Sequence, residues 1–127
     1  MEKTIIKTSK APSAIGPYSQ AVKSGNFIFA SGQIPLDPIS GEMIGSDIKT
    51  QTERVMENIK GVLESEGLDF ANVIKTTCFL SDMSNFASFN EVYSKYFVEN
   101  PPARSCVAVK QLPKDALVEV EIIAVLN

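Results

Sequence analysis

Only two segments of this 127-residue chain carry the hydrophobic period of an α-helix, and this limits the fold more than any other feature. The first is 47–65, where five apolar residues recur at helical spacing. Ser46 or Asp47 can cap its start, and Gly67 can end it. The second is 85–97, which has five aromatic residues at helical spacing. We therefore expect two helices, with strands elsewhere.

The remaining apolar runs are short and bounded by Gly and Pro, as strands are. They lie at 3–7, 19–24, 27–33, 73–80, 105–109 and 117–126. Gly25-Asn26, between the second and third runs, is typical of a two-residue hairpin. The resulting order, βββαβαββ, predicts a single α+β domain over residues 1–127, with both helices on one face of a mixed sheet.

Two helices cover only one face of such a sheet. Three strand segments, however, are apolar on both faces, at 27–30, 77–80 and 122–126. Monomeric proteins rarely leave a large apolar patch exposed. We therefore expect an obligate oligomer in which a neighbouring copy covers the open face.

The composition excludes several kinds of site. The chain has no histidine, which rules out a Ser-His-Asp triad and any His-ligated metal. Cys78 and Cys106 lie far apart without a CxxC spacing, so they indicate no thiolate zinc site or redox motif. The net charge is −3 and the only arginines are Arg54 and Arg104, which argues against nucleic-acid binding.

The sequence also predicts the compartment. Its N-terminal segment has no apolar stretch of signal-peptide length. The longest apolar run, 122–126, is too short to cross a membrane, so no membrane partner is expected. With two cysteines and no signal peptide, we expect a reduced protein in the cytoplasm.

Arg104 and Glu119 are the strongest candidates for chemistry. Arg104 opens an apolar strand, where a guanidinium suits a carboxylate or phosphate; the simpler interpretation is a salt-bridged or solvated arginine. Glu119 lies among β-branched residues that would raise its pKa and suit it to accept a proton from water. The simpler interpretation is a solvent-facing carboxylate or a structural partner of Arg104. If 105–109 and 117–126 pair as a hairpin, the two side chains lie at similar heights.

Tyr18 and the triplet Ser31-Gly32-Gln33 are further candidates. Tyr18 follows Gly16-Pro17 in a loop that enters a strand, so its phenol can be aimed at a cleft. Gly32 within a strand pattern predicts a bulge or a close backbone approach. A capping aromatic and a plain bulge are the simpler interpretations.

Phe86 and Asn90 are one helical turn apart and share a helix face. Their simplest roles are a core side chain and a packing amide. Cys106 is most simply a small buried side chain. Arg54 lies among acidic residues of the first helix, which is typical of a solvated face with local ion pairs.

Four sequence motifs, taken together, are specific enough to indicate a protein family. They are Ala14-Ile-Gly-Pro-Tyr-Ser-Gln-Ala21, Ala30-Ser-Gly-Gln-Ile-Pro35, Pro102-Ala-Arg-Ser-Cys-Val107, and Leu112-Pro-Lys-Asp followed by Val-Glu-Val120. In this order and spacing, the chain resembles the Rid/YjgF family from end to end. Within that family it most resembles the RidA subgroup of imine deaminases.

The resemblance implies a chorismate-mutase-like α+β fold and a homotrimer with clefts between subunits. It implies deamination of 2-imino and enamine acids, such as 2-aminoacrylate, 2-iminopropanoate and 2-iminobutanoate, to 2-oxo acids and ammonia, without a cofactor. Carried over by motif, Arg104 holds the substrate carboxylate and Glu119 positions the attacking water. The cleft residues so implied are Tyr18, Ser31, Gly32, Phe86, Asn90 and the backbone of Cys106.

Two other functions stay open. One is an RNA-acting translation inhibitor or endoribonuclease, which the negative charge and the lack of a basic, aromatic stripe disfavour. The other is a non-catalytic trimer that senses a ligand or acts as a chaperone. A carboxylate-binding arginine serves sensing and catalysis equally well, so the sequence does not separate these two.

Overall fold

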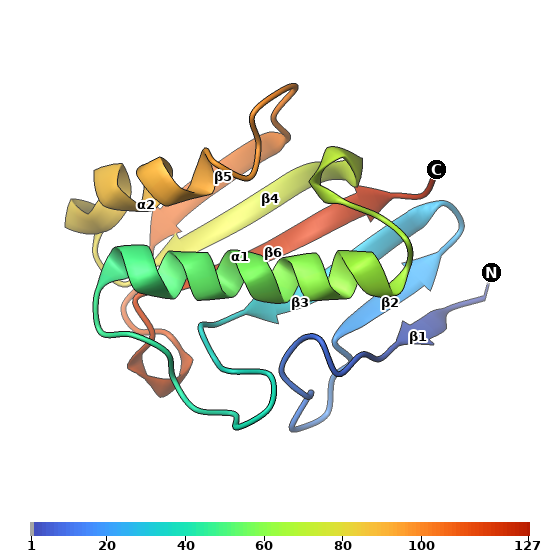
Figure 1. Cartoon of the computed structure of the whole chain (residues 1–127), viewed down its shortest axis with the longest axis horizontal. Helices are drawn as coiled ribbons and strands as arrows, with labels where there is room; N and C mark the ends of the chain where they lie inside the picture. Colours follow the sequence, from blue (N-terminus) through green and yellow to red (C-terminus); the bar gives the residue numbers. More distant parts are fainter. Residues whose placement is uncertain (1) are drawn as a thin grey trace.

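The computed structural model describes residues 2–127. A six-stranded mixed sheet, in the strand order β1-β2-β3-β6-β4-β5, carries both helices on one face (Figure 1). The elements in chain order are β1 (Thr4–Ile6), β2 (Ala21–Ser24), β3 (Phe27–Gln33), α1 (Ile48–Ser65), β4 (Val73–Leu80), α2 (Phe86–Tyr93), β5 (Ala103–Ala108) and β6 (Val118–Val125). The predicted order βββαβαββ and the α+β class are confirmed.

α1 begins and ends where the local sequence predicts. The Asp47 carboxylate accepts a hydrogen bond from the Thr50 amide (3.0 Å), so Asp47 rather than Ser46 is the N-cap. After the last turn, Gly67 has φ +70°, and its N–H donates to the Glu64 carbonyl (3.0 Å). That left-handed conformation favours glycine and ends the helix.

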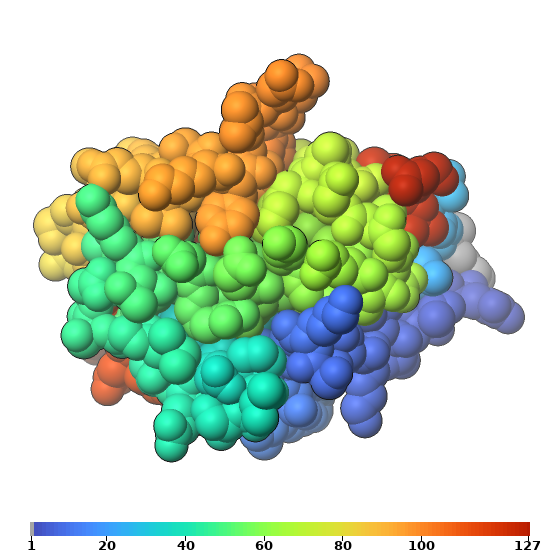
Figure 2. Space-filling view, in the orientation of Figure 1, coloured from blue at the N-terminus to red at the C-terminus, as the bar shows by residue number. Residues whose placement is uncertain are grey.

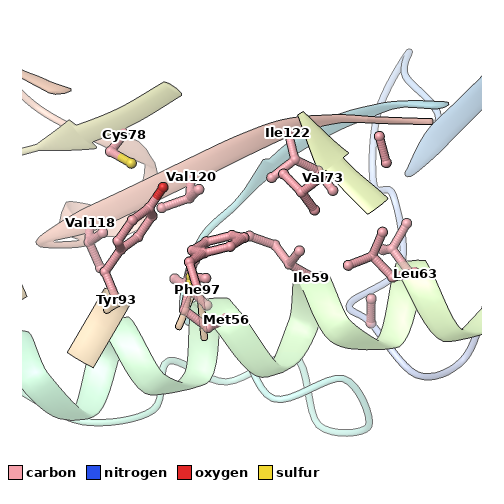
Figure 3. Close-up of a cluster of buried hydrophobic side chains, with 14 of the residues drawn as sticks. Met56, Ile59, Leu63, Val73, Cys78, Tyr93, Phe97, Val118, Val120 and Ile122 are labelled. Carbon is pink, nitrogen blue, oxygen red and sulfur yellow. The ribbon is translucent and has the colours of Figure 1, made fainter. Parts of the chain in front are cut away.

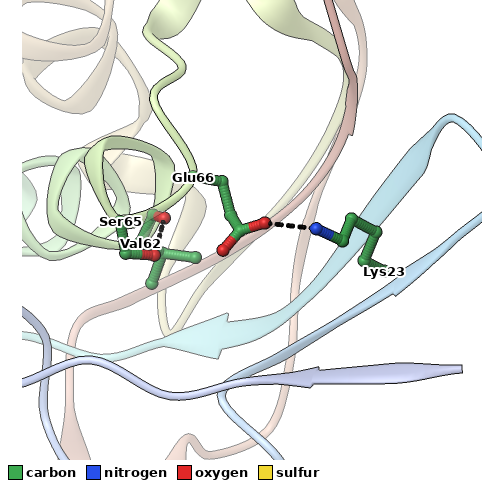
Figure 4. Close-up of polar contacts among 4 residues, drawn as sticks. All are labelled: Lys23, Val62, Ser65 and Glu66. Carbon is green, nitrogen blue, oxygen red and sulfur yellow. Dashed lines mark hydrogen bonds and ion pairs between the residues drawn. The ribbon is translucent and has the colours of Figure 1, made fainter.

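One ion pair ties the end of α1 to the sheet (Figure 4). Lys23 Nζ in β2 lies 2.8 Å from Glu66 Oε1, directly after α1. Nearby, Ser65 Oγ donates to the Val62 carbonyl (2.6 Å). Because both charged side chains are partly exposed, the pair contributes at most about 1 kcal/mol.

α2 is shorter than predicted. It ends at Tyr93, and residues 94–96 continue as turns in which the N–H groups of Lys95 and Tyr96 donate to carbonyls three residues earlier. This tightening turns Phe97 into the core, where its ring lies edge-on against Phe70 at a centroid distance of 5.4 Å. The helical spacing of aromatic residues in the sequence therefore extends past the end of the helix. The last aromatic rings are there because they pack in the core, and not because the helix continues.

The core lies between the helices and the sheet (Figure 3). Buried side chains of α1 face those of β6, and α2 adds aromatic rings between them. They include Met56, Ile59 and Leu63 from α1, Val118, Val120 and Ile122 from β6, and Phe89 and Tyr93 from α2. In β6 the buried residues alternate with Glu119 and Glu121, which therefore face away from the helices.

The last two strands do not pair as a hairpin. β5 runs parallel to β4, with Arg104 level with Thr76, while β6 pairs antiparallel with β4 and β3. The parallel crossover through α2 places β5 next to β4. β6, which is apolar on much of both faces, takes the position between β3 and β4. Arg104 is therefore level with Ile122, two strands away, and not with Glu119.

The helix side of the molecule is covered by the two helices and the loops before α1, as Figure 2 shows. The opposite face carries apolar side chains that no element covers: Phe27, Phe29 and Val107 are 43%, 45% and 47% exposed. The expected uncovered apolar face is therefore present. Within residues 2–127, no helix combines the length and the apolar character needed to cross a membrane.

Candidate functional site

Arg104 lies at the β5 edge of the sheet, on the side of α2. Its Nη1 donates to Asn90 Oδ1 at 2.6 Å, and its guanidinium carbon lies 5.4 Å from the centroid of the Phe86 ring. It also lies 4.8 Å from the centroid of the Tyr93 ring. The aromatic faces attract the cation and, with Asn90, hold its plane in one orientation. Three predicted site residues are thus brought together.

Tyr93 also belongs to this cluster, although the sequence alone did not indicate it as a site residue. Its hydroxyl shares a 2.7 Å hydrogen bond with Thr76 Oγ1, and burial raises the pKa of its phenol. The ring is therefore fixed beneath Arg104. Phe86, Asn90 and Tyr93 have the spacing i, i+4, i+7, which is the signal that groups all three on one helix face.

A shallow hollow of about 380 Å³ opens beside Arg104. Its walls come from the end of α2 and from the Pro101-Pro102 segment before β5. Only one hydrogen bond of the guanidinium is made within residues 2–127, to Asn90. Because a guanidinium has five N–H donors, it keeps donors for a planar anion in this hollow.

Cys106 lies two residues after Arg104 on the same side of β5 and is level with Cys78 of β4. Both cysteines are free thiols. Burial raises the pKa of Cys78 to about 12 and also raises the pKa of Cys106, although Arg104 opposes that shift. Cys106 therefore stays protonated and partly packed, which suits a wall of a site and not a nucleophile.

A second cleft, of about 650 Å³, lies on the opposite face of the sheet. Tyr18, Ser31, Gly32 and Glu119 all line it. The register of β3 against β6 shifts between Ala30 and residue 33, so the predicted bulge at Gly32 is confirmed. Ser31 Oγ donates to the carbonyl of the residue after Tyr18 (2.6 Å), which ties the bulge to the Tyr18 loop.

Glu119 lies directly over Gly32 in this cleft. A Cβ placed on Gly32 would come within 2.8 Å of Glu119 Cδ, so only glycine leaves room for this carboxylate. Burial and, to a smaller degree, the neighbouring Glu121 raise the pKa of Glu119 above its usual range. The carboxylate therefore binds a proton more tightly than an exposed glutamate does, which suits it to accept one from water.

The two groups of predicted residues do not meet within one chain. Arg104 contacts α2, whereas Glu119 lies on the face that the helices leave open. Their backbones are also far apart. β5 and β6 are separated by two strand spacings, about 10 Å, and Glu119 lies three residues along β6 from the level of Arg104, about another 10 Å. The cation and the carboxylate therefore lie on opposite faces of the chain, each in its own cleft.

Comparisons with known proteins identify the family. The family model described as Endoribonuclease L-PSP matches residues 8–126. A RutC family protein of Pyrococcus abyssi is 57% identical over 124 residues, which cover 98% of each chain. The chain belongs to the Rid/YjgF family.

Solved structures of Rid/YjgF proteins agree closely with this fold. The Rid family protein YyfA of Yersinia pestis has a TM-score of 0.94 at 45% identity, covering 98% of this chain and 100% of its own. E. coli TdcF with bound serine has a TM-score of 0.93 at 44% identity, covering 98% and 99%. These neighbours have the chorismate-mutase-like fold, so the fold implied by the resemblance is confirmed.

In this Rid/YjgF chain, Gly32→Ala should displace Glu119 without unfolding the protein. Glu119 can swing away from the new methyl group, but it then leaves its place in the cleft. We expect the melting temperature to stay close to wild type, while any reaction that depends on this carboxylate slows about tenfold or more. The same substitution in a Glu119→Gln background should change little, because the carboxylate is then already absent. An unchanged rate of such a reaction in Gly32→Ala would contradict this arrangement.

Proposed function

We propose that the protein hydrolyses 2-imino acids and their enamine tautomers to 2-oxo acids and ammonia, at a site built from two copies of the chain. The observation that carries this proposal is the pair of half-sites. One presents a fixed guanidinium with free donors, and the other presents a half-buried carboxylate with a raised pKa. Together they supply what hydrolysis of an imino acid needs.

The chemistry is simple enough for these two groups. Arg104 binds the carboxylate that all 2-imino acids share. Glu119 takes a proton from a water molecule whose oxygen adds to the C=N carbon, and that proton passes to nitrogen. The hydroxyl proton of the resulting aminoalcohol then moves to nitrogen, and the C–N bond breaks as the C=O bond forms, which releases ammonia. Because the iminium carbon is already electrophilic, fixing the acid and the water supplies much of the rate enhancement.

Joining the half-sites requires a second copy of the chain. Contact between the β5 side of one copy and the Glu119 cleft of the next uses two different surfaces, and such contacts form a ring when the rotation between copies closes. The open face exposes Phe27, Phe29 and Val107, and burying these apolar side chains against a second copy would be favourable. Taken with the resemblance, these features favour a homotrimer whose sites lie between protomers.

We expect light scattering in dilute, salt-containing buffer to give three times the chain mass of 13.8 kDa. Dilution to micromolar concentration should not change that mass, because the covered face is apolar. A monodisperse monomer at that concentration would contradict both the trimer and the shared site.

The family model's description, Endoribonuclease L-PSP, makes RNA cleavage the second candidate. The charges of the Glu119 cleft oppose it, since Glu119 and Glu121 line that cleft with Lys114 as the one cation among its described lining residues. Two carboxylates repel a phosphate backbone. E. coli TdcF, by contrast, has been solved with bound serine. Serine is an amino acid, and it carries the same carboxylate group that we propose Arg104 binds in a 2-imino acid.

The test generates 2-iminobutanoate with threonine dehydratase and follows its decay with and without this protein. We expect the decay rate to rise in proportion to protein concentration. Binding of a 2-oxo acid without faster decay would favour a ligand sensor and contradict the enzyme. Cleavage of a single-stranded RNA, together with an unchanged rate of imine decay, would favour the second candidate.

A further inference from the structure

Three connecting segments, 12–15, 34–36 and 113–114, form the rim of the Glu119 cleft. The first two lie outside the strands and helices, and the third belongs to a short 3-10 helix, Pro113–Asp115. Because such short connections make few main-chain hydrogen bonds of their own, their positions depend on bonds to the rest of the fold. Three amide side chains, each at most 4% exposed, make such bonds to the first two segments and to Leu117, which follows the third.

Gln20 holds the first segment. Its Nε2 donates to the carbonyls of Thr8 (3.0 Å), Ala11 (3.2 Å) and Pro12 (2.8 Å). Its Oε1 accepts the Thr8 N–H at 2.7 Å. One buried amide thus closes the loop that ends at Pro12, the first rim residue. The main-chain carbonyl of Gln20 accepts the Ser31 N–H (2.9 Å), which joins this loop to the bulge under Glu119.

Asn58 of α1 holds the second segment. Its Nδ2 donates to the carbonyls of Ile34 (3.3 Å) and Leu36 (2.9 Å), and both of these residues line the cleft. Its Oδ1 accepts a hydrogen bond from Arg54 Nε (3.1 Å). The NH2 group of Asn58 therefore holds the rim, whereas its side-chain oxygen bonds within α1.

Gln51 lies two turns before Asn58 on α1, and its side-chain oxygen binds the main chain just after the third segment. Its Oε1 accepts the N–H of Leu117 (2.8 Å), which follows the turn that carries rim residues 113–114. Its Nε2 donates to the Gly45 carbonyl (3.0 Å), which does not line the cleft.

We propose that Gln20, Gln51 and Asn58 are positioning residues that preorganise the Glu119 cleft. Gln20 and Asn58 hold carbonyls of the first two rim segments, and Gln51 holds Leu117, which follows the third. None of them touches the proposed reacting atoms. Buried hydrogen bonds of this kind are worth most where the alternative is an unpaired carbonyl. A cleft held in this way loses precision when one support is removed. The proposal deepens the imine hydrolysis proposed above, and its kinetic test rests on that function.

Replacing each amide with the acid of the same shape removes its NH2 donor and keeps its oxygen acceptor. Gln20→Glu and Asn58→Asp lose the donors that hold rim carbonyls, whereas Gln51→Glu keeps the acceptor that holds Leu117. We expect the first two variants to raise KM for 2-iminobutanoate about tenfold, with a smaller change in kcat. Gln51→Glu should stay within about twofold of wild type in KM, even where its melting temperature falls. A purely structural role would lower all three melting temperatures without this pattern in KM.

The matched control is Thr52→Val. Thr52 is also fully buried in α1, and its hydroxyl donates to the Ile48 carbonyl (2.7 Å) within the helix, away from the rim. This variant loses a buried hydrogen bond without touching a rim segment, so its KM should match wild type. If Gln20→Glu or Asn58→Asp does not fold, the uncharged Gln20→Met and Asn58→Leu replace them.

Hydrogen exchange gives a readout that does not need activity. Without ligand, the rim peptides should exchange about tenfold faster in Gln20→Glu and Asn58→Asp, while β4 keeps its protection. If wild type hydrolyses no imine, the proposed function fails and hydrogen exchange alone decides this inference. Wild-type KM and wild-type exchange of the rim in both variants would overturn it.

Discussion

Replacing Arg104 with alanine is expected to lower kcat/KM for 2-iminobutanoate at least about 30-fold. The substrates share one group, the carboxylate, and a charge-assisted pair in a partly dried cleft is worth roughly 2–5 kcal/mol when truncated. Arg104→Lys should recover only part of the loss. An ammonium does not reproduce the planar fork, and it would lie less favourably on the rings of Phe86 and Tyr93.

The measurement is the rate of imine decay, with the oligomeric state checked in the same sample. Lys49→Ala is the matched control, because Lys49 is an exposed cation paired with Glu91 of α2 and lies outside both half-sites. It should keep wild-type kinetics. A loss of activity that accompanies dissociation would make Arg104 a structural residue, and a folded, trimeric and fully active Arg104→Ala would contradict the carboxylate-binding role.

Glu119→Gln is expected to reduce kcat by roughly 10²-fold, while the binding of a 2-oxo acid changes little. The amide keeps the shape that lies over Gly32 but accepts no proton from water. Turnover and product binding, measured on the same preparation, separate these effects. Full turnover in the variant would show that something other than Glu119 activates the water.

The raised pKa of Glu119 also predicts two pH dependences. Activity needs the ionised carboxylate, so kcat/KM should fall as pH drops through the raised pKa, and this limb should vanish in Glu119→Gln. A raised pKa means that the folded chain holds this proton more tightly than the unfolded chain. Ionisation above the raised pKa therefore destabilises the fold, and Glu119→Gln should melt at a higher temperature in that pH range. This difference should shrink as pH falls towards the usual glutamate pKa.

Local patterns in the sequence were enough to place the elements. α1 was predicted within one residue at its start, because a cap, a helical stripe and a terminal glycine all mark it. The partner of β5 could not be predicted in this way. Strand pairing depends on contacts between distant segments, and the crossover through α2 places β5 beside β4 and not beside β6.

The same limit applies to the candidate site. Arg104 and Glu119 were singled out as residue types in unusual surroundings, but their separation onto two faces follows from the sheet order. The supporting amides left no sequence signal, because Gln20 and Asn58 bond to main-chain carbonyls that any residue provides. Their residue types are usually exposed, so only the fold identifies them as buried supports.

The central claim is that Arg104 of one copy and Glu119 of another form one site, and mixing two inactive variants tests it most directly. Arg104→Ala and Glu119→Gln are unfolded together, refolded at equal amounts and assayed for decay of 2-iminobutanoate. Each shared site then has an even chance of receiving an intact residue from each copy, so about a quarter of wild-type activity should return. Each variant refolded alone should stay inactive. No recovery in a mixed oligomer of the correct mass would contradict a shared site.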